Sequence, residues 1–219
     1  MKIQWLGHAA FLITAADGTT ILMDPYESGS YGGGIGYGPI HVSADILTIS
    51  HDQHEDHNYV KGITGNPEVI KGAGKDHIKG VTITRVATFH DNSQGKERGP
   101  NCVVCLEKEG LHICHLGDLG HVLTSEQVNA IGPVDILLIP IGGVFTIDPS
   151  EATEVVKLLK PRIVIPMHYK TPKCGFPLAT VDPFTEGKDR VTHHGSSEIV
   201  VTKDALPKET EIIVLQYAL

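Results

Sequence analysis

The sequence has too few cysteines for a disulfide-stabilised fold, with four in 219 residues. Dense disulfide frameworks are typical of much shorter secreted domains. Cys102 and Cys105 have the spacing of half a zinc ribbon, but no second pair follows them. Both lie in a predicted strand, where this spacing places the two thiols on opposite faces. We therefore expect Cys102 and Cys105 to be buried structural residues.

Long apolar runs and clusters of basic residues are also absent. No run approaches the ~20 residues that span a membrane, and residues 1–5 lack the apolar region of a signal peptide. Lys and Arg total 18 against 26 Asp and Glu, for a net charge of −8. An acidic surface repels phosphate backbones, so we expect no nucleic-acid partner. These absences predict a cytoplasmic protein that binds neither membranes nor nucleic acids.

The length and composition fit one domain that covers residues 1–219. Hydrophobic residues make up 41% of the chain, enough for a sizeable core. Histidine is the outlying residue type, because the chain has 13 where ordinary usage gives about five. The positions of these histidines indicate whether they are scattered over a polar surface or belong to one site.

The first part of the sequence predicts short β-strands and a glycine-rich loop. Residues 11–14 and 20–23 read as strands joined by a hairpin turn around Asp17 and Gly18. Residues 27–39 contain six glycines, without the Gly-Lys-Ser/Thr ending of a phosphate-binding loop. This segment is either a mobile lid over an active site or a plain surface loop.

Further along the chain, buried strands alternate with helices. A capping-box sequence at Thr124 predicts a helix to about Ile131. Asp148, followed by Pro149 and Glu151, predicts a second helix that ends at Lys160. Strands are predicted at 45–49, 69–70, 81–87, 101–106, 111–116, 135–140, 162–166, 198–201 and 211–215. The pattern indicates a layered α/β fold.

The most distinctive segment is Ser-His-Asp-Gln-His-Glu-Asp-His at residues 50–57. It places three histidines and three carboxylates directly after an apolar strand. Like charges crowd there unless a cation compensates them. Imidazole and carboxylate together suit zinc, iron or manganese rather than calcium or magnesium alone. The alternative interpretation of the octet by itself is a solvated polar loop.

Three more candidate ligands follow predicted strands at their carboxyl ends, namely His90, Asp118 and His168. In open α/β sheets, sites form outside the carboxyl ends of strands. One histidine at a strand end is usually a hydrogen-bonded polar residue. Four strand ends that each deliver His or Asp favour a shared metal site.

These motifs resemble those of the metallo-β-lactamase superfamily, whose signature is His-x-His-x-Asp-His. Segments 5–11, 115–121 and 139–143 are similar to the branch that holds the ascorbate-6-phosphate lactonase and many uncharacterised zinc-dependent hydrolases. The resemblance spans nearly the whole chain and keeps the motif order. It implies an α/β fold built as a four-layer αββα sandwich.

The resemblance also implies a centre of two divalent metal ions, zinc foremost, with manganese or iron as alternatives. It assigns His54 and His90 to the first ion, Asp56, His57 and His168 to the second, and Asp118 to a bridging position. The chain departs from the signature at its first histidine, because two residues separate His51 from His54. Either His51 is a ligand through a bulged loop or Asp52 replaces it, and Ser-His at the strand end favours His51.

Four residues outside the ligand set are candidates for supporting or substrate-binding roles. Asp24 resembles the first motif of the family, whose carboxylate supports the ligand loops. His8, Arg98 and Tyr169 are candidate substrate-binding residues, each with a structural role as the alternative. Arg98 could meet an anionic group through bidentate hydrogen bonds.

The function that these features predict is hydrolysis of a small ester, lactone or phosphate ester by a water that two metal ions activate. Asp56 is the candidate catalytic residue that accepts or relays the proton. Alternatives are a small-nucleotide phosphodiesterase, a di-iron redox protein and a non-catalytic metal-binding module. The resemblance makes a homo-oligomer a further expectation.

Overall fold

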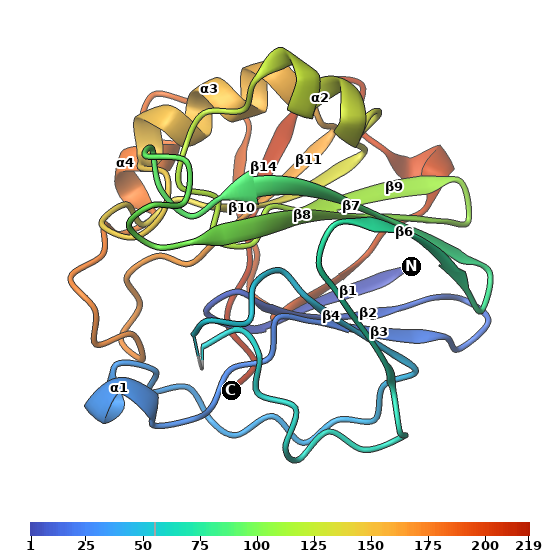
Figure 1. Cartoon of the computed structure of the whole chain (residues 1–219). Helices are drawn as coiled ribbons and strands as arrows, with labels where there is room; N and C mark the ends of the chain where they lie inside the picture. Colours follow the sequence, from blue (N-terminus) through green and yellow to red (C-terminus); the bar gives the residue numbers. More distant parts are fainter. Residues whose placement is uncertain (55) are drawn as a thin grey trace.

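The structure is a computed structural model that describes residues 1–54 and 56–219, and in it two β-sheets pack face to face (Figure 1). The first sheet has six strands in the order β13-β1-β2-β3-β4-β5. Their bounds are β1 (Lys2–Gly7), β2 (Ala10–Thr14), β3 (Thr20–Met23), β4 (Ile46–Ile49), β5 (Glu68–Lys71) and β13 (Glu198–Val200). The hairpin predicted around Asp17 and Gly18 is confirmed, because β2 and β3 pair antiparallel.

The second sheet has eight strands in the order β12-β14-β11-β10-β9-β8-β7-β6. Strands β9, β10, β11, β14 and β12 run parallel, and β6 to β9 pair antiparallel. The bounds are β6 (Gly74–Ile78), β7 (Val81–Phe89), β8 (Pro100–Lys108), β9 (Leu111–His115), β10 (Ile136–Pro140), β11 (Ile163–Met167), β12 (Val191–His193) and β14 (Glu211–Val214).

Helices cover the outer face of the eight-stranded sheet (Figure 1). They are α2 (Ser125–Ile131), α3 (Pro149–Leu159) and α4 (Asp182–Thr185), and a 3₁₀ turn follows at Lys203–Ala205. Both predicted helices are confirmed with their capping boxes, formed by Thr124 with Gln127 and by Asp148 with Glu151. None of the described helices is long and apolar enough to cross a membrane.

The main core lies between the two sheets. Every residue of β10 and β11 is buried, because helices cover one face of these strands and the six-stranded sheet covers the other. Trp5 and Phe11 of the first sheet belong to the same apolar cluster as Val103 and Ile113 of the second. The layered α/β architecture is therefore confirmed.

A second core lies on the outer face of the six-stranded sheet, where loops take the place of a helical layer. Leu22 and Leu47 pack there with Tyr26, Ile35 and Tyr37. The only described helix on this side is the single turn α1 (Ser30–Gly33) at its margin (Figure 1). The fourth layer of the sandwich is thus built from irregular chain that carries buried apolar side chains.

The glycine-rich segment 27–39 belongs to this covering layer. Ile35 forms a β-bridge with Cys174, and the Gly36 amide donates to the Lys173 carbonyl at 2.8 Å. A side chain at Gly36 would place its Cβ 2.7 Å from that carbonyl oxygen, so the close approach requires glycine. The segment is irregular apart from the single turn of α1, and backbone hydrogen bonds anchor it.

The sequence-based prediction did not include β6, β12, α1, α4 or the 3₁₀ turn. Strand β6 has only Ile78 as an apolar residue and lies at a sheet edge, and β12 and α4 have three and four residues. Cys102 is buried as expected, whereas Cys105 is only half-buried. Cys105 faces Cys114 across β8 and β9, with 3.7 Å between the two sulfur atoms.

Because the loops pack tightly on the outer face of the six-stranded sheet, truncating a buried side chain there should lower the stability of the protein. Leu47→Ala should lower the free energy of unfolding by about 2–5 kcal/mol, because it leaves a cavity at a fully buried position. The control Val200→Ala, at a side chain that is 74% exposed, should change it by less than about 0.5 kcal/mol. Urea denaturation measures both, and equal effects would contradict a packed outer core.

Candidate metal centre

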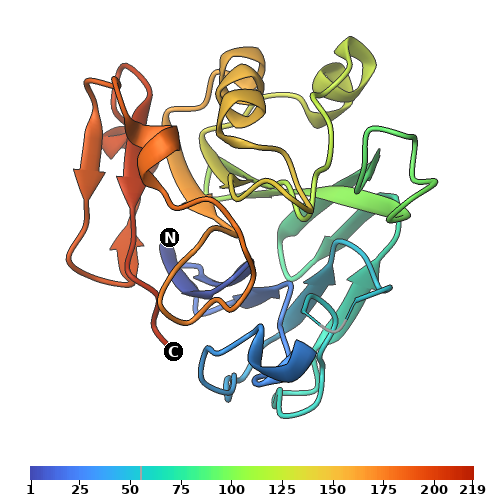
Figure 2. The same cartoon turned by 90° about the vertical axis from the view of Figure 1, so that its left-hand side faces the viewer.

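Strand ends from both sheets meet at one edge of the molecule, which faces the viewer in Figure 2. In the first sheet β1, β3 and β4 run in the same direction, and in the second sheet β7, β9, β10 and β11 do so. Their carboxyl ends lead into His8 after β1, His51 after β4, His90 after β7, Asp118 after β9 and His168 after β11. The predicted convergence of strand ends thus brings these side chains together.

Asp24 holds the start of the histidine segment. It follows β3 and accepts hydrogen bonds from the Ser50 amide at 2.7 Å and the Ser50 hydroxyl at 2.6 Å. The Ser50 hydroxyl lies 3.0 Å from His51 Nδ1. This chain of contacts orients the His51 ring, which is the supporting role that the sequence motif implies for Asp24.

The first group of candidate ligands consists of His51, His54 and His90. Their nitrogen atoms lie within 4.8 Å of one another. The ring centroids are 5.4 Å apart for His51 and His54, 5.2 Å for His51 and His90, and 5.5 Å for His54 and His90. Three imidazoles that face one another at this spacing form one side of a metal site.

The second group consists of Asp56 and His168, whose ligand atoms lie within 4.8 Å of each other and of an Asp118 oxygen. His57 adjoins this group with Nδ1 3.3 Å from Asp56 Oδ1. His8 and His57 form a further set with His168 under the same distance limit. The second group is therefore richer in donors than the first.

Asp118 lies between the two groups. Its Oδ2 is 3.2 Å from His90 Nε2 and 3.8 Å from His51 Nε2. Its Oδ1 is 2.9 Å from His57 Nε2 and 3.5 Å from His168 Nε2. One carboxylate oxygen thus faces each group, which is the placement expected of a bridging ligand.

Gly117 makes this placement sterically feasible. It has a positive φ of 56°, and a Cβ there would lie 2.5 Å from both Asn101 Oδ1 and Ser50 Cβ. The Asn101 side-chain oxygen accepts from the Asp118 amide at 3.0 Å. The sequence Leu116-Gly117-Asp118 therefore delivers the carboxylate through a turn that a larger residue would obstruct.

The donor atoms of the cluster lack the partners that buried polar atoms require. Among the described residues, twelve buried side-chain nitrogen and oxygen atoms make no hydrogen bond, and nine of them belong to His8, His51, His57, His90, Asp118 and His168. An unpaired buried polar atom costs about 1–3 kcal/mol. Imidazole nitrogens and carboxylate oxygens at this density fit a pair of transition-metal ions, which would satisfy their lone pairs.

The protonation states agree with this fit. Burial lowers the pKa of His51 and of His168 to about 3, although Asp118 opposes the change. Burial would raise the pKa of Asp118, but His168, His57 and His90 hold it well below its usual range. Neutral imidazoles and an ionised carboxylate are the forms that bind metal ions.

His57 is the exception among the histidines. Burial would lower its pKa, but Asp118 and Asp56 raise it well above the ordinary value. Burial raises the pKa of Asp56, and His57 and His8 more than offset this, so that carboxyl is ionised. His57 is thus held between two carboxylates at the centre of the cluster.

The unusual spacing of the first two histidines is accommodated by the loop. His51 is buried within the cluster, whereas the Asp52 side chain is 56% exposed and pairs with Lys71 at 3.0 Å. The structure therefore brings His51, and not Asp52, to the candidate ligands. Glu55, the remaining carboxylate of the octet, lies outside the described residues.

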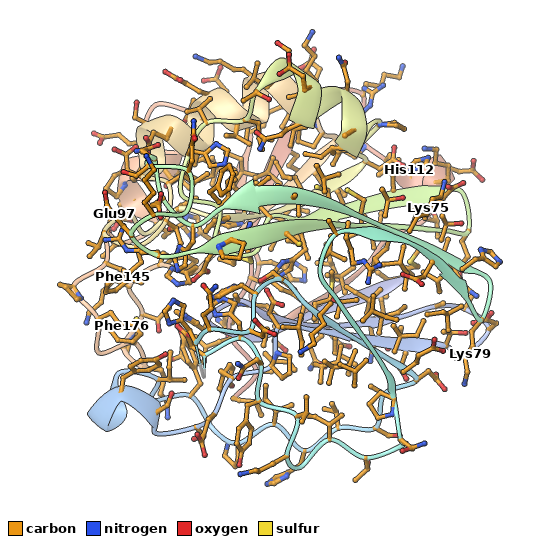
Figure 3. The ribbon with its side chains drawn as sticks, in the orientation of Figure 1. Lys75, Lys79, Glu97, His112, Phe145 and Phe176 are labelled. Carbon is orange, nitrogen blue, oxygen red and sulfur yellow. The ribbon has the colours of Figure 1, made fainter. Side chains whose placement is uncertain are left out.

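A cavity of about 290 Å³ opens above the cluster. Its lining includes the cluster members His54, Asp56, His90, Asp118 and His168. The remaining lining residues are Tyr31, Glu97, Arg98, Phe145 and Phe176. Figure 3 shows Glu97, Phe145 and Phe176 along this same edge of the molecule.

The structure places two of the three candidate substrate-binding residues outside the lining of this cavity. His8 is fully buried, does not line the cavity, and has Nε2 3.4 Å from Asp56 Oδ2. It belongs to the ligand cluster, since it follows β1 at the same edge as the other ligands. Tyr169 does not line the cavity either, because its ring stacks on Trp5 with centroids 5.3 Å apart. Arg98 does line it.

The sequence reasoning missed four cavity residues, Tyr31, Glu97, Phe145 and Phe176. Phe145 and Phe176 lie in the loops after β10 and β11, the strand-end position that identified the ligands. The rule that site residues follow the carboxyl ends of strands could therefore have identified Phe145 and Phe176. Tyr31 lies in α1, within the glycine-rich segment that the sequence marked as a possible lid, and Glu97 lies in the loop after β7.

Comparison with known proteins agrees with the fold and the cluster. Residues 2–168 match the family described as the β-lactamase superfamily domain. Two relatives are each named UPF0173 metal-dependent hydrolase. The one from Thermococcus onnurineus is 34% identical over 84% of this chain and 89% of its own length. The one from Thermococcus kodakarensis is 35% identical over 78% of this chain and 85% of its own.

A crystal structure from Thermotoga maritima is similar over almost the whole chain. It represents a candidate zinc-dependent hydrolase of the metallo-β-lactamase superfamily, with 40% identity and a TM-score of 0.81. The match covers 98% of this chain and 97% of that protein. The chain therefore belongs to the UPF0173 metal-dependent hydrolase family of the metallo-β-lactamase superfamily.

The loop geometry predicts which of two adjacent residues supports metal binding. His51→Ala should reduce the metal content per chain, because the first group loses one of its three imidazoles. Asp52→Ala, one position away at an exposed carboxylate, should leave it unchanged. Elemental analysis of the purified proteins measures both, and the reverse pattern would contradict the placement of His51.

Proposed function

We propose that the protein hydrolyses a small ester, lactone or phosphate ester with two divalent metal ions, zinc foremost. The observation that carries the proposal is the position of Asp118, with one oxygen toward each group of histidines at the floor of the cavity. When bound, such ions lower the pKa of water and polarise the oxygen of the bond under attack.

The chain itself would hold the two ions through separate sets of residues. His51, His54 and His90 would hold the first, and Asp56, His57 and His168 the second, with Asp118 between them. His8 adds an imidazole to the second set. The backbone supports this set, because the His8 carbonyl accepts from both the Trp5 indole at 3.0 Å and the His168 amide at 3.1 Å.

Asp56 is our candidate for the proton acceptor. Its carboxylate is ionised and lines the cavity. Oδ2 faces the His8 ring, while Oδ1 accepts from the Tyr31 hydroxyl at 3.4 Å. We propose that Asp56 accepts the proton of the attacking water at one of these oxygens and passes it to the leaving group.

The size and surroundings of the cavity favour a small substrate. A volume of about 290 Å³ suits a compact molecule, and a net charge of −8 disfavours long polyanions. The free cysteines are compatible with the reducing cytoplasm. The lactonase branch, the choice of zinc over manganese or iron, and a homo-oligomeric assembly remain predictions.

The test is hydrolysis by metal-loaded protein of a panel of esters, lactones, phosphomonoesters and phosphodiesters. Asp118→Ala should lower kcat/KM on any accepted substrate by more than about 100-fold, because it removes the carboxylate shared by both groups. The exposed Asp52→Ala provides the matched control and should retain activity. Absence of turnover across the panel by protein that holds two metals would contradict the proposal, as would full activity of Asp118→Ala.

A further inference from the structure

The cavity above the cluster has walls of two different chemical kinds. One is aromatic and consists of Tyr31, Phe145 and Phe176. The other is charged and consists of Glu97 and Arg98. We infer that the substrate is an amphipathic anion, with an apolar group held by the three aromatic side chains and an acidic group, separate from the bond that is cleaved, held by Arg98. This inference rests on the proposed function and names its substrate class.

The aromatic wall is a connected unit built from three separate segments. The Phe176 ring lies 5.5 Å from that of Phe145 and 5.6 Å from that of Tyr31, both in edge-on geometry. Tyr31 comes from α1, Phe145 from the loop after β10, and Phe176 from the loop after β11. Rings in such contact hold one another in place and present apolar surface to a bound group.

Backbone contacts anchor the aromatic wall before any ligand binds. The Gly175 amide donates to the Gly34 carbonyl at 2.8 Å, and the Lys170 ammonium donates to the Phe176 carbonyl at 2.9 Å. A Cβ at Gly34 would lie 2.8 Å from the Phe176 ring. The glycine-rich segment therefore provides the space in which Phe176 packs, and a preformed wall lowers the entropic cost of binding.

Hydrogen bonds also hold the loop that carries Arg98. The buried Asp91 carboxylate accepts hydrogen bonds from the backbone amides of Ser93, Gly95, Glu97 and Arg98, at 2.7 to 3.0 Å. A single carboxylate that binds four amides fixes the course of the loop. The position of Arg98 at the cavity is thus a property of the fold.

The charge of Arg98 has no protein counterpart in the described part of the chain. Its guanidinium lies 5.9 Å from the centre of the Phe145 ring and forms no ion pair there. The neighbouring Glu97 carboxylate accepts from the Ser93 hydroxyl at 2.7 Å. A half-buried guanidinium over an aromatic ring is suited to a carboxylate or phosphate, which it binds through two parallel hydrogen bonds.

The two walls and the floor together define three-point binding. The bond to be cleaved lies over Asp56 and Asp118, the apolar group packs on Phe145 and Phe176, and the acidic group reaches Arg98. Cations bound by the cluster would add to the positive potential of Arg98 and attract an anion further. A neutral substrate of the same size would lose the Arg98 contact.

The test compares two esters of similar length on metal-loaded protein, the mono-4-nitrophenyl ester of glutaric acid and the neutral 4-nitrophenyl valerate. Wild type should prefer the acidic ester in kcat/KM. Arg98→Ala should reduce kcat/KM for the acidic ester on the order of 10- to 100-fold and change that for the neutral ester less than about threefold. Arg98→Lys should be intermediate, and the surface control Arg190→Ala should match wild type.

A binding measurement keeps the inference independent of turnover. Isothermal titration calorimetry on metal-loaded protein would compare 4-phenylbutyrate and phenethyl phosphate with the neutral 4-phenylbutanol. Arg98→Ala should weaken binding of at least one acid about tenfold or more and leave the alcohol unchanged, and Phe176→Ala should weaken all that bind. Whichever of the two acids binds wild type more tightly identifies the preferred acidic group as carboxylate or phosphate.

The outcomes separate the inference from the proposed function. If wild type hydrolyses neither these esters nor the wider panel, the proposed function fails. The calorimetry alone then decides whether Arg98 binds an anion. If Arg98→Ala binds both acids as wild type does, or if no ligand binds wild type, the inference is overturned whatever the hydrolytic activity. Metal content should equal that of wild type in the Arg98, Phe176 and Arg190 variants.

Discussion

The contact of Asp118 with two groups of histidines is the interaction around which the site is arranged. Each of its oxygens faces one group, with 3.2 Å to His90 and 2.9 Å to His57. A fully desolvated carboxylate in a cluster where several buried imidazole nitrogens make no hydrogen bond is unfavourable unless cations complete the set. The free energy of the folded state is therefore tied to metal binding, since ions that bind only the native protein stabilise it.

The fold delivers this arrangement through strand direction. Several strands of each sheet end at one edge, so short turns after β1, β4, β7, β9 and β11 carry the ligands to one place. Backbone strain accompanies this convergence, because His8, Asp24 and His168 all have positive φ although none is glycine. Non-glycine residues persist in that conformation where surrounding contacts determine it, and such positions gather at functional sites.

Much of the fold and most of the candidate metal cluster could be predicted from the sequence, because both depend on local patterns. Capping boxes identified α2 and α3, and polar residues after apolar strands identified His90, Asp118 and His168. The role of His8 and the stacking of Tyr169 on Trp5 depend on long-range packing that no local pattern encodes. The same holds for the loop layer over Leu22 and Leu47.

The most direct test of the account is anomalous X-ray diffraction from crystals of metal-loaded protein, collected at the absorption edge of the bound metal. The account predicts two peaks on the order of 3.5–4 Å apart, one among His51, His54 and His90 and the other beside Asp56 and His168, with Asp118 in contact with both. A single peak, or peaks that do not touch Asp118, would contradict a dinuclear centre bridged by that carboxylate.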